Sequence, residues 1–361
     1  MTRTKAQDYL AWVRRLALVA GVALITVTLA VGCSSSSSDS TNGANPPPST
    51  TPPPSTTPPP SGEVDARVIA DEIALFALEY ESFSDLVRDA ADGAEDPSSI
   101  VPLSVNAGSS GNPLVTMTQS ILDLVKKSGE IGIQATEEQF CESGQIAVNQ
   151  EADGYSIVFT ECSYVFGGTT FVSDGAVSYQ SKLNGGSINY RNLEYTLGKG
   201  GDSLALKANG TIDLEETQPF GAAGKVTLNI SYDLLVSCGG ETVSASFAYE
   251  NFVIDSDVEG AIAVSGTWSF SFTGEGGFAT RVAISTQERI RYEDPFSDYP
   301  TAGKVTAVAD GQTIVVEFVA GGVLINGVFV SWEELEADLD DDFDDVFGQC
   351  SFFDFESDFD F

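Results

Sequence analysis

The sequence of 361 residues contains no histidine, and only 17 lysine and arginine residues stand against 53 aspartate and glutamate residues. Without histidine, the chain can build no Ser-His-Asp triad, no Cys-His dyad and no His-ligated zinc or haem site. The formal net charge of −36 argues against nucleic acid as a partner, because such binding needs basic side chains that displace counterions. The same charge argues against an anionic membrane surface as a partner of the folded part.

The common catalytic motifs are missing too. We find no phosphate-binding loop, no nucleophile elbow and no CxxC pair. Carboxylate pairs can hydrolyse glycosides, but no spacing singles out one pair among 53 carboxylates. We therefore predict no catalytic residues, no metal site and no cofactor, and we expect that the protein is not an enzyme.

The N-terminus has the build of an export signal. Basic residues precede an apolar run over residues 16–30, which is shorter than the roughly twenty residues that a membrane-spanning helix needs. A basic stretch followed by a short apolar run is typical of a secretory signal peptide. The sequence therefore predicts a signal peptide over residues 1–32.

The residues that follow the apolar run are Leu29-Ala30-Val31-Gly32-Cys33. This motif resembles the lipobox of bacterial lipoproteins, with Ala30 in place of the commoner leucine. The resemblance implies cleavage after Gly32 and lipidation of Cys33, with acyl chains such as palmitate that anchor the protein to a membrane. Ser34, in place of aspartate, implies delivery to the outer membrane. Whether the protein then faces the periplasm or the outside is left open.

Residues 33–62 form a tether rather than a domain. They are rich in serine and then repeat Pro-Pro-Pro-Ser-Thr-Thr, a composition that buries no apolar surface and stays disordered. Polyproline II geometry gives residues 46–62 a reach of roughly 50 Å. A spacer that holds the domain off the membrane is one interpretation. A linker without a length requirement and an O-glycosylated stalk are the others.

Helical periodicity follows over residues 63–135. Apolar residues spaced three and four apart predict a helix over residues 64–91, and they are Ile69, Ile73, Phe76, Tyr80, Phe83 and Val87. A second helix is predicted from Asn112-Pro113, which suits a helix start, to Gly129. We expect this helical segment to pack on a sheet.

We expect a β-domain over residues 136–361, in which the period changes from 3.6 to 2 at about residue 144. Apolar residues alternate with Ser, Thr and Asn over residues 226–236 and 268–273, and glycine-rich turn signals separate about ten to twelve such runs. The fold class that we predict is mainly β with N-terminal helices (α+β). Its centre is a large antiparallel meander sheet, curved into a half-barrel or a sandwich.

A weak internal repeat crosses these strands. Tyr190-Arg191-Asn192-Leu193 is echoed by Tyr249-Glu250-Asn251-Phe252, and Gly210-Thr211-Ile212 is echoed by Gly266-Thr267-Trp268. The repeat indicates one strand-turn-strand unit used twice, and chance similarity between strands is the alternative.

Residues 153–162 and 299–305 resemble recurring segments of β-rich outer-membrane lipoproteins of Gram-negative bacteria. The resemblance extends loosely over residues 140–330. It implies the β-rich shape and the envelope location, and it carries no activity and no site.

Four cysteines remain beside Cys33, and their even number in an exported chain predicts two disulfides. They are Cys141, Cys162, Cys238 and Cys350. A hairpin loop at residues 151–154 makes residue 150 face residue 155, which leaves Cys141 and Cys162 as diagonal neighbours that need a bulge or a frayed end to meet. We prefer the pair Cys141–Cys162, which leaves Cys238–Cys350. Free buried thiols are the alternative.

The C-terminus is acidic. A capping box at Ser331-Trp332-Glu333-Glu334 predicts an amphipathic helix over residues 332–347. The aspartates of residues 340–345 fail the calcium-loop pattern, because positions six and twelve lack its glycine and glutamate. Phenylalanines then alternate with acidic residues over residues 353–361. We interpret this end as an edge strand, and the insertion signal of an outer-membrane β-barrel is the alternative.

Three functions follow from this organisation. The first is a lipid-anchored envelope protein with a structural or partner-binding β-domain, whose partner is an envelope protein or a glycan. The second is a carrier of a lipid or other apolar ligand on the concave face of the sheet, where Tyr232, Trp268 and Phe270 would line an open groove. The third is the outer-membrane β-barrel. An open groove or a filled core at these three aromatic residues separates the first two.

Overall fold

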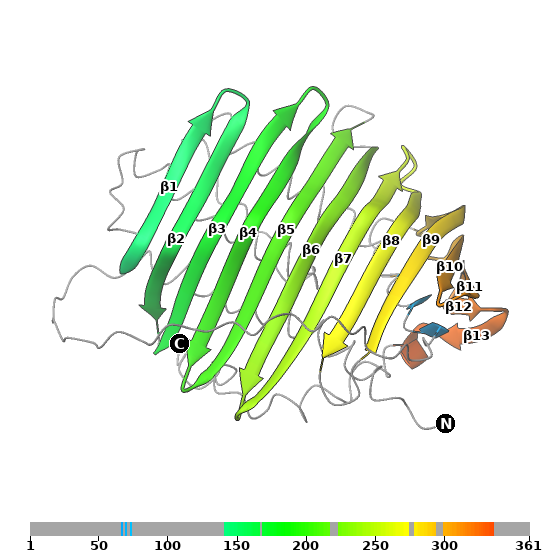
Figure 1. Cartoon of the computed structure of the whole chain (residues 1–361). Coiled ribbons are helices and arrows are strands. Elements are labelled where there is room, and N and C mark those ends of the chain that lie inside the picture. Colours follow the sequence, from blue (N-terminus) through cyan, green and yellow to red (C-terminus); the bar gives the residue numbers. More distant parts are fainter. Residues whose placement is uncertain are drawn as a thin grey trace, which may run out of the picture.

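The structure is a computed structural model that describes residues 66–67, 69–70, 73, 141–166, 168–216, 223–273, 278–293 and 299–335. Thirteen strands form a single antiparallel sheet, and each strand pairs with its neighbours in the sequence (Figure 1). The outer strands, β1 and β13, do not pair with each other, so the sheet is open. The predicted antiparallel meander is therefore confirmed. A sandwich is not observed, because all the described strands belong to one sheet.

The strands fall into two groups by length. β1 to β9 have between 9 and 16 residues, whereas β10 to β13 have between 4 and 8 and lie at one end of the sheet (Figure 1). The bounds are β1 Ser143–Glu151, β2 Gly154–Phe166, β3 Thr169–Lys182, β4 Gly185–Lys199, β5 Asp202–Glu216, β6 Gly224–Cys238, β7 Glu241–Ser256, β8 Ile262–Thr273, β9 Phe278–Arg291, β10 Ala302–Ala309, β11 Gln312–Val319, β12 Gly322–Ile325 and β13 Val328–Ser331. The sequence predicted ten to twelve strands, at least one fewer than the thirteen observed. Strands of four residues, such as β12 and β13, are too short to show a recognisable alternation.

Alternation sets the face of each strand. In β6, buried and more exposed residues alternate along nearly the whole strand, as the sequence predicts. Short turns between strands use residues that tolerate a positive φ, such as Asn326 (φ 52) and Gly327 (φ 83). One of the glycine-rich turn signals, Gly185-Gly186, is displaced: Leu183 and Asn184 form the turn, and Gly185 is already the first residue of β4.

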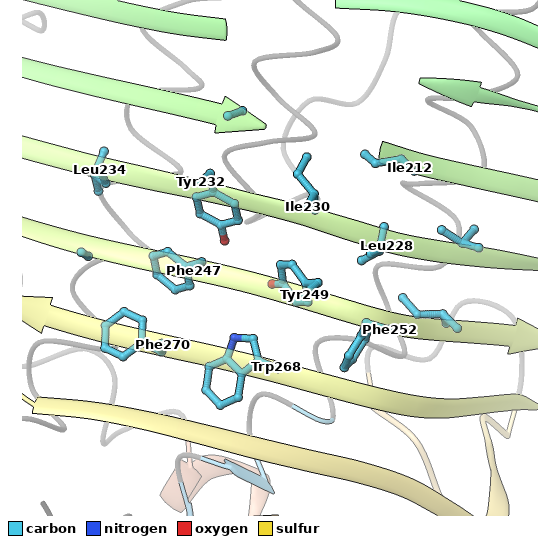
Figure 2. Packing of buried hydrophobic residues seen from close by; sticks show 14 of the residues in the cluster. Ile212, Leu228, Ile230, Tyr232, Leu234, Phe247, Tyr249, Phe252, Trp268 and Phe270 are labelled. Carbon is cyan, nitrogen blue, oxygen red and sulfur yellow. The ribbon is translucent and has the colours of Figure 1, made fainter. Parts of the chain in front are cut away.

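The core covers one face of the sheet. Its largest fully buried side chains are aromatic, and they include Trp268, Tyr190, Phe171, Phe252, Phe270 and Phe272. Rings from adjacent strands contact one another, as Tyr232 and Phe247 do with centroids 4.6 Å apart (Figure 2). Burying such a side chain stabilises the fold by roughly 1.5–3 kcal/mol, so this aromatic face supplies much of the driving force for folding.

Helical residues are few in the part of the chain that the structure describes. Ile69, Ala70 and Ile73 are helical and belong to the core of the sheet. The remainder of the predicted helical segment, including the helix from Asn112, lies outside the described residues. At the other end, residues 332–335 are helical, and the remainder of the helix predicted over residues 332–347 lies outside as well.

The predicted capping box is present at Ser331. The Glu334 amide donates to the Ser331 Oγ at 3.2 Å, and the Ser331 amide donates to the Glu334 Oε2 at 3.0 Å. These bonds from the Ser331 amide and then from its hydroxyl hold the pKa of the exposed Glu334 carboxyl below its ordinary value, because they favour the charged form. The chain therefore turns away from β13 at a well-capped helix start.

A series of β-bulges crosses the middle of the sheet. At Asn192 of β4 and Asn251 of β7 the backbone is left-handed, with φ of 47° and 46°, and the strand register shifts at both sites. The amide of Asn192 donates to Oδ1 of Asn209 at 2.7 Å, and the amide of Asn251 donates to Oδ1 of Asn229 at 2.8 Å. An Asn side chain on the adjacent strand thus holds each bulge.

These bulges explain the internal repeat. Both Tyr-x-Asn motifs place their asparagine at a bulge, and both Gly-Thr motifs place a glycine on a neighbouring strand. A Cβ on Gly210 would lie 2.1 Å from the carbonyl oxygen of Asn229, and one on Gly266 would lie 2.4 Å from that of Asn251. The two copies of the repeat therefore lie on the hairpins β4–β5 and β7–β8, and each copy places its Tyr-x-Asn asparagine at a bulge.

Candidate functional site

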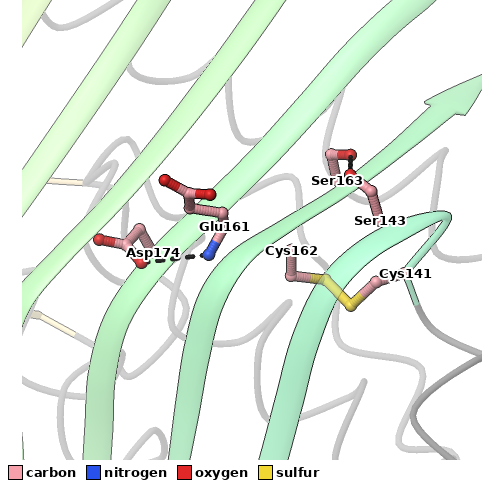
Figure 3. Close-up of a disulfide and its surroundings, with 6 residues drawn as sticks. All are labelled: Cys141, Ser143, Glu161, Cys162, Ser163 and Asp174. Carbon is pink, nitrogen blue, oxygen red and sulfur yellow. Dashed lines mark hydrogen bonds between the residues drawn. A yellow bond between two sulfur atoms is a disulfide. The ribbon is translucent and has the colours of Figure 1, made fainter. Parts of the chain in front are cut away.

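The edge formed by β1 and β2 is closed at one end by a disulfide. Cys141 and Cys162 are bonded, with their Cα atoms 5.2 Å apart (Figure 3). The register predicted from the hairpin is present, since Gln150 pairs with Tyr155. A register shift beside Gly144 then moves the strand end by one residue, so that Ser143 faces Ser163. This irregularity brings together Cys141 and Cys162, which the hairpin register alone would leave as diagonal neighbours.

The same irregularity has its own hydrogen bonds. Glu161 has a left-handed backbone with φ of 46°, and its amide donates to Oδ1 of Asp174 on β3 at 3.2 Å (Figure 3). The hydroxyl groups of Ser143 and Ser163 lie 2.6 Å apart. The start of β1 is therefore fixed both by a covalent bond and by side-chain hydrogen bonds.

The other predicted cysteines are only partly placed. Cys238, the last residue of β6, is disulfide-bonded, and its partner lies outside the described residues. Cys33 and Cys350 both lie outside them. The pairing of Cys238 with Cys350 therefore stays a prediction, as does the lipidation of Cys33.

The three aromatic residues predicted to bind an apolar ligand lie on one face of the sheet, with Tyr232 on β6, Trp268 and Phe270 on β8, and β7 between them (Figure 2). Tyr232, Trp268 and Phe270 are 4%, 1% and 1% exposed. The ring of Phe247 connects them, because it stacks on Tyr232 and lies 4.7 Å from the ring of Phe270. Such burial favours a filled core over an open groove at these positions.

The opposite face of the sheet is polar, and most of its described lysines and arginines pair with carboxylates of other strands or loops. Bidentate bonds of 3.0 and 2.6 Å join the guanidinium of Arg281 on β9 to the carboxylate of Glu250 on β7. Other pairs along β3 to β11 are Lys182–Asp213, Lys207–Glu194, Lys225–Glu215 and Lys304–Glu317. Each such exposed pair stabilises the fold by at most about 1 kcal/mol. The pairs therefore neutralise charge locally and contribute little to the stability of the sheet.

An arginine organises the loop between β7 and β8. The Arg289 guanidinium donates to the carbonyl oxygens of Asp255 and Ala261 at 2.9 and 3.0 Å, and it also pairs with the Asp255 carboxylate. The carboxylate of Asp257 lies 3.6 Å from Nε of the same arginine and accepts the amide of Ala261 at 2.9 Å. Sequence reasoning missed this cluster.

A signal for this cluster was nevertheless present. The sequence Asp255-Ser-Asp257-Val-Glu259-Gly260 has the spacing of the first half of a calcium loop, although Gly266 stands where that loop needs a glutamate. In the structure a guanidinium occupies the centre of these oxygens, and Arg291 pairs with Glu259 at 3.1 Å. No group of three or more potential ligands in the described part of the chain is arranged to hold a metal ion.

Strand β1 differs from the rest of the sheet. From Ser143 to residue 150 it has no charged residue and no proline, and residues 142–149 are exposed except for the half-buried Ile146. Residues 141–166 contain four carboxylates and no lysine or arginine. Among the described residues, no ion pair reaches this strand pair. The sequence reasoning assigned no role to this edge.

Comparisons with known proteins found no matching family model, no similar curated protein and no similar solved structure. A search of the described residues also found no helix long and apolar enough to cross a membrane.

Proposed function

We propose that the protein is a lipid-anchored component of the outer membrane, in which a non-enzymatic, partner-binding β-domain is held off the bilayer by the tether of residues 33–62. The observation that carries the proposal is the order of the segments. The lipobox-like motif at residues 29–33 is followed by a spacer that is rich first in serine and then in proline, then by the segment of residues 63–135 and then by one large sheet. An anchor, a spacer and a display domain are the parts that a tethered binding protein needs.

The sheet is better suited to binding a partner than to catalysis. Its apolar face is buried, its polar face carries paired charges, and its one described cluster of acidic residues is neutralised by arginines. Such a surface offers hydrogen bonds and charge to a partner, whereas catalysis needs groups with perturbed pKa values gathered in a cleft.

The proposal includes the helices that the sequence predicts. We propose that the helical segment of residues 63–135 covers the apolar face, because Ile69, Ala70 and Ile73 are helical and already contact that core. At the C-terminus, the capping box at Ser331 begins the amphipathic helix of residues 332–347. Leu335, which is 4% exposed, would be the first residue of its buried stripe.

Membrane fractionation of the protein expressed in a Gram-negative bacterium tests the anchor. The unchanged chain should fractionate with the outer membrane and resist extraction by salt. Cys33→Ser should release the folded protein from the membrane or leave it uncleaved. Ser34→Asp is the matched variant, because it keeps the acylated cysteine and should move the protein to the inner membrane. Unchanged fractionation of Cys33→Ser would overturn the proposal.

A further inference from the structure

Between the irregularity beside Gly144 and the charged Glu151, the described outer edge of β1 lacks the charges and proline with which sheet edges avoid pairing. Natural edge strands are kept short, carry charges or proline, or are covered by other elements. β1 has nine residues, and the eight residues from Ser143 to residue 150 are uncharged and include no proline. An exposed strand of this kind presents a row of backbone groups to any extended segment.

We propose that β1 is a docking site for an extended segment of another protein, which adds a strand to the open edge of the sheet. The segment alternates apolar and small polar residues in its centre and carries basic residues at both ends. This inference rests on the partner-binding role proposed above, and it names the class of partner.

The apolar centre of the partner segment is inferred from the side chains of β1 that face the core. Ile146 and Val148 pair with Phe159 and Ile157 of β2, both of which are buried, so the row of inward-facing side chains ends at β1. Val148 is still 45% exposed. Apolar residues of an added strand would cover this row and continue the core by one strand.

The other face of β1 sets a different requirement. Gln145, Ala147 and Asn149 alternate with the inward-facing residues and are exposed. Side chains of this size and polarity accept Ser, Thr or Asn on a neighbouring strand. The partner segment should therefore be apolar on one face only.

The basic ends of the partner segment follow from the acidic residues at both ends of β1. Glu142 and Glu151 flank the neutral run, and Asp153 follows in the turn, with no basic residue within residues 141–166. From β3 to β11, by contrast, many carboxylates have a basic partner across strands. Because both ends of β1 are acidic, basic residues are favoured at both ends of the partner, whichever way it runs.

The same charges disfavour two other occupants. A second copy pairing β1 with β1 would bring Glu142 of one chain near Glu151 of the other at both ends of the pair. The chain's own C-terminal segment holds thirteen carboxylates in residues 331–361. Like charges directly opposite one another on paired strands are destabilising. A basic-flanked segment of another protein meets no such repulsion.

The Cys141–Cys162 disulfide adds to the case. Edge strands lose order at their ends more easily than central strands do, and ordering them costs binding free energy. The disulfide fixes the first end of β1 to β2, and the hairpin turn fixes the other end. The edge is therefore preorganised for a partner.

The probe is a fluorescently labelled peptide with the sequence Lys-Lys-Thr-Val-Thr-Val-Thr-Val-Thr-Lys-Lys, titrated against the full mature chain in detergent. One control peptide replaces its central valine with proline, which removes a backbone donor, and another replaces the lysines with glutamate. We expect saturable binding of the lysine peptide alone, weakened by salt. Hydrogen exchange should slow in residues 143–150 and not in β13.

Two valines on the outer strands form a matched pair of variants. Val148 on β1 and Val328 on β13 are 45% and 67% exposed. Val148→Lys places a charge in the proposed seam and should weaken binding by about tenfold or more. Val328→Lys places the same charge on the other edge and should leave binding unchanged. Equal thermal unfolding of both variants shows that the folds are intact.

Reversal of the flanking charges tests the second half of the proposal. The double variant Glu142→Lys, Glu151→Lys should bind the lysine peptide about three- to tenfold more weakly and bind the glutamate peptide instead. Equal binding of the lysine peptide and its proline variant would overturn the proposal. Equal weakening of binding by Val328→Lys and Val148→Lys would also overturn it. So would a dimer that Val148→Lys dissociates, because β1 would then pair with its own copy. None of these results depends on lipidation of Cys33, so the proposed anchoring can fail or stand separately.

Discussion

At one edge of the sheet, β1 extends over nine residues, stays uncharged through residue 150 and is bound to β2 by the Cys141–Cys162 disulfide. At the other edge, β13 has four residues, and the chain leaves it through the capped turn at Ser331. There the ring of Trp332 stacks on Tyr299 with centroids 4.8 Å apart. One edge is long and held by a covalent bond, whereas the other is short and followed at once by other structure.

The difference teaches how a single open sheet can have one edge that is too short for extended pairing and another edge that is available for it. A short strand followed by a capped helix start offers little length for pairing. A long neutral strand that is fixed at both ends offers a ready template. Changes at each edge should therefore act locally and independently of the other edge.

The largest expected effect is removal of the disulfide. Its half-cystines are separated by 21 residues, for which loop-closure entropy predicts a loss of about 3 kcal/mol in the free energy of unfolding. The double variant Cys141→Ser, Cys162→Ser should also speed amide exchange in β1 and leave β13 unchanged. Ser143→Ala, which removes only a hydroxyl contact, is the control and should cost less than about 1 kcal/mol. Equal acceleration at both edges would contradict independent edges.

Next in size is loss of the Trp332 ring. Its half-buried side chain contacts Tyr299 and Phe318, so Trp332→Ala should lower the unfolding free energy by about 2 kcal/mol, less than for a fully buried tryptophan. Trp332→Phe keeps a stacking ring and should lose less than half as much. Amide exchange should accelerate in β11 to β13 and not in β1. An effect that appears first in β1 would refute the local role.

A smaller effect is expected at the cap. Ser331→Ala removes the hydroxyl that accepts the Glu334 amide and should cost about 1 kcal/mol. Ser331→Thr keeps the hydroxyl and should cost little. Chemical denaturation of both variants measures the difference. Equal losses in the two variants would show that the cap contributes nothing through its hydroxyl.

The smallest effect is the pH dependence of the same cap. The pKa of Glu334 is lowered in the folded protein by the Ser331 amide and hydroxyl, so its contribution is present above the unfolded pKa of about 4.3. It is lost as the pH falls through the lower folded value. NMR titration of the Glu334 carboxyl should show the lowered pKa, and Ser331→Ala should raise it part of the way back. An unshifted pKa in the unchanged protein would contradict the capping geometry.

Much of the sheet could be predicted because its signals are local. Alternation over residues 226–236 predicted the faces of β6, and the hairpin loop expected at residues 151–154 predicted the register of β1 on β2. That register then predicted both the Cys141–Cys162 bond and the irregularity needed to close it. The capping box at Ser331 was readable because its members are three residues apart.

The contacts that could not be predicted from the sequence depend on the register between strands that are not joined by short turns. Arg289 meets Asp255 only because β7, β8 and β9 are offset by bulges, and no spacing in the sequence reports those offsets. β12 and β13 were too short to show alternation. The Tyr-x-Asn repeat was visible, but its meaning as a bulge required the left-handed backbone at Asn192 and Asn251.

Mass spectrometry of the intact protein extracted from membranes tests the central claim most directly. A tethered lipoprotein should begin at Cys33, carry the added mass of acyl chains, and weigh four hydrogens less than its fully reduced form. Proteolytic fragments should then join Cys238 to Cys350. An unmodified N-terminus, or a fragment that joins Cys238 to Cys33, would contradict the anchor, because an oxidised Cys33 thiol is not free to carry a lipid.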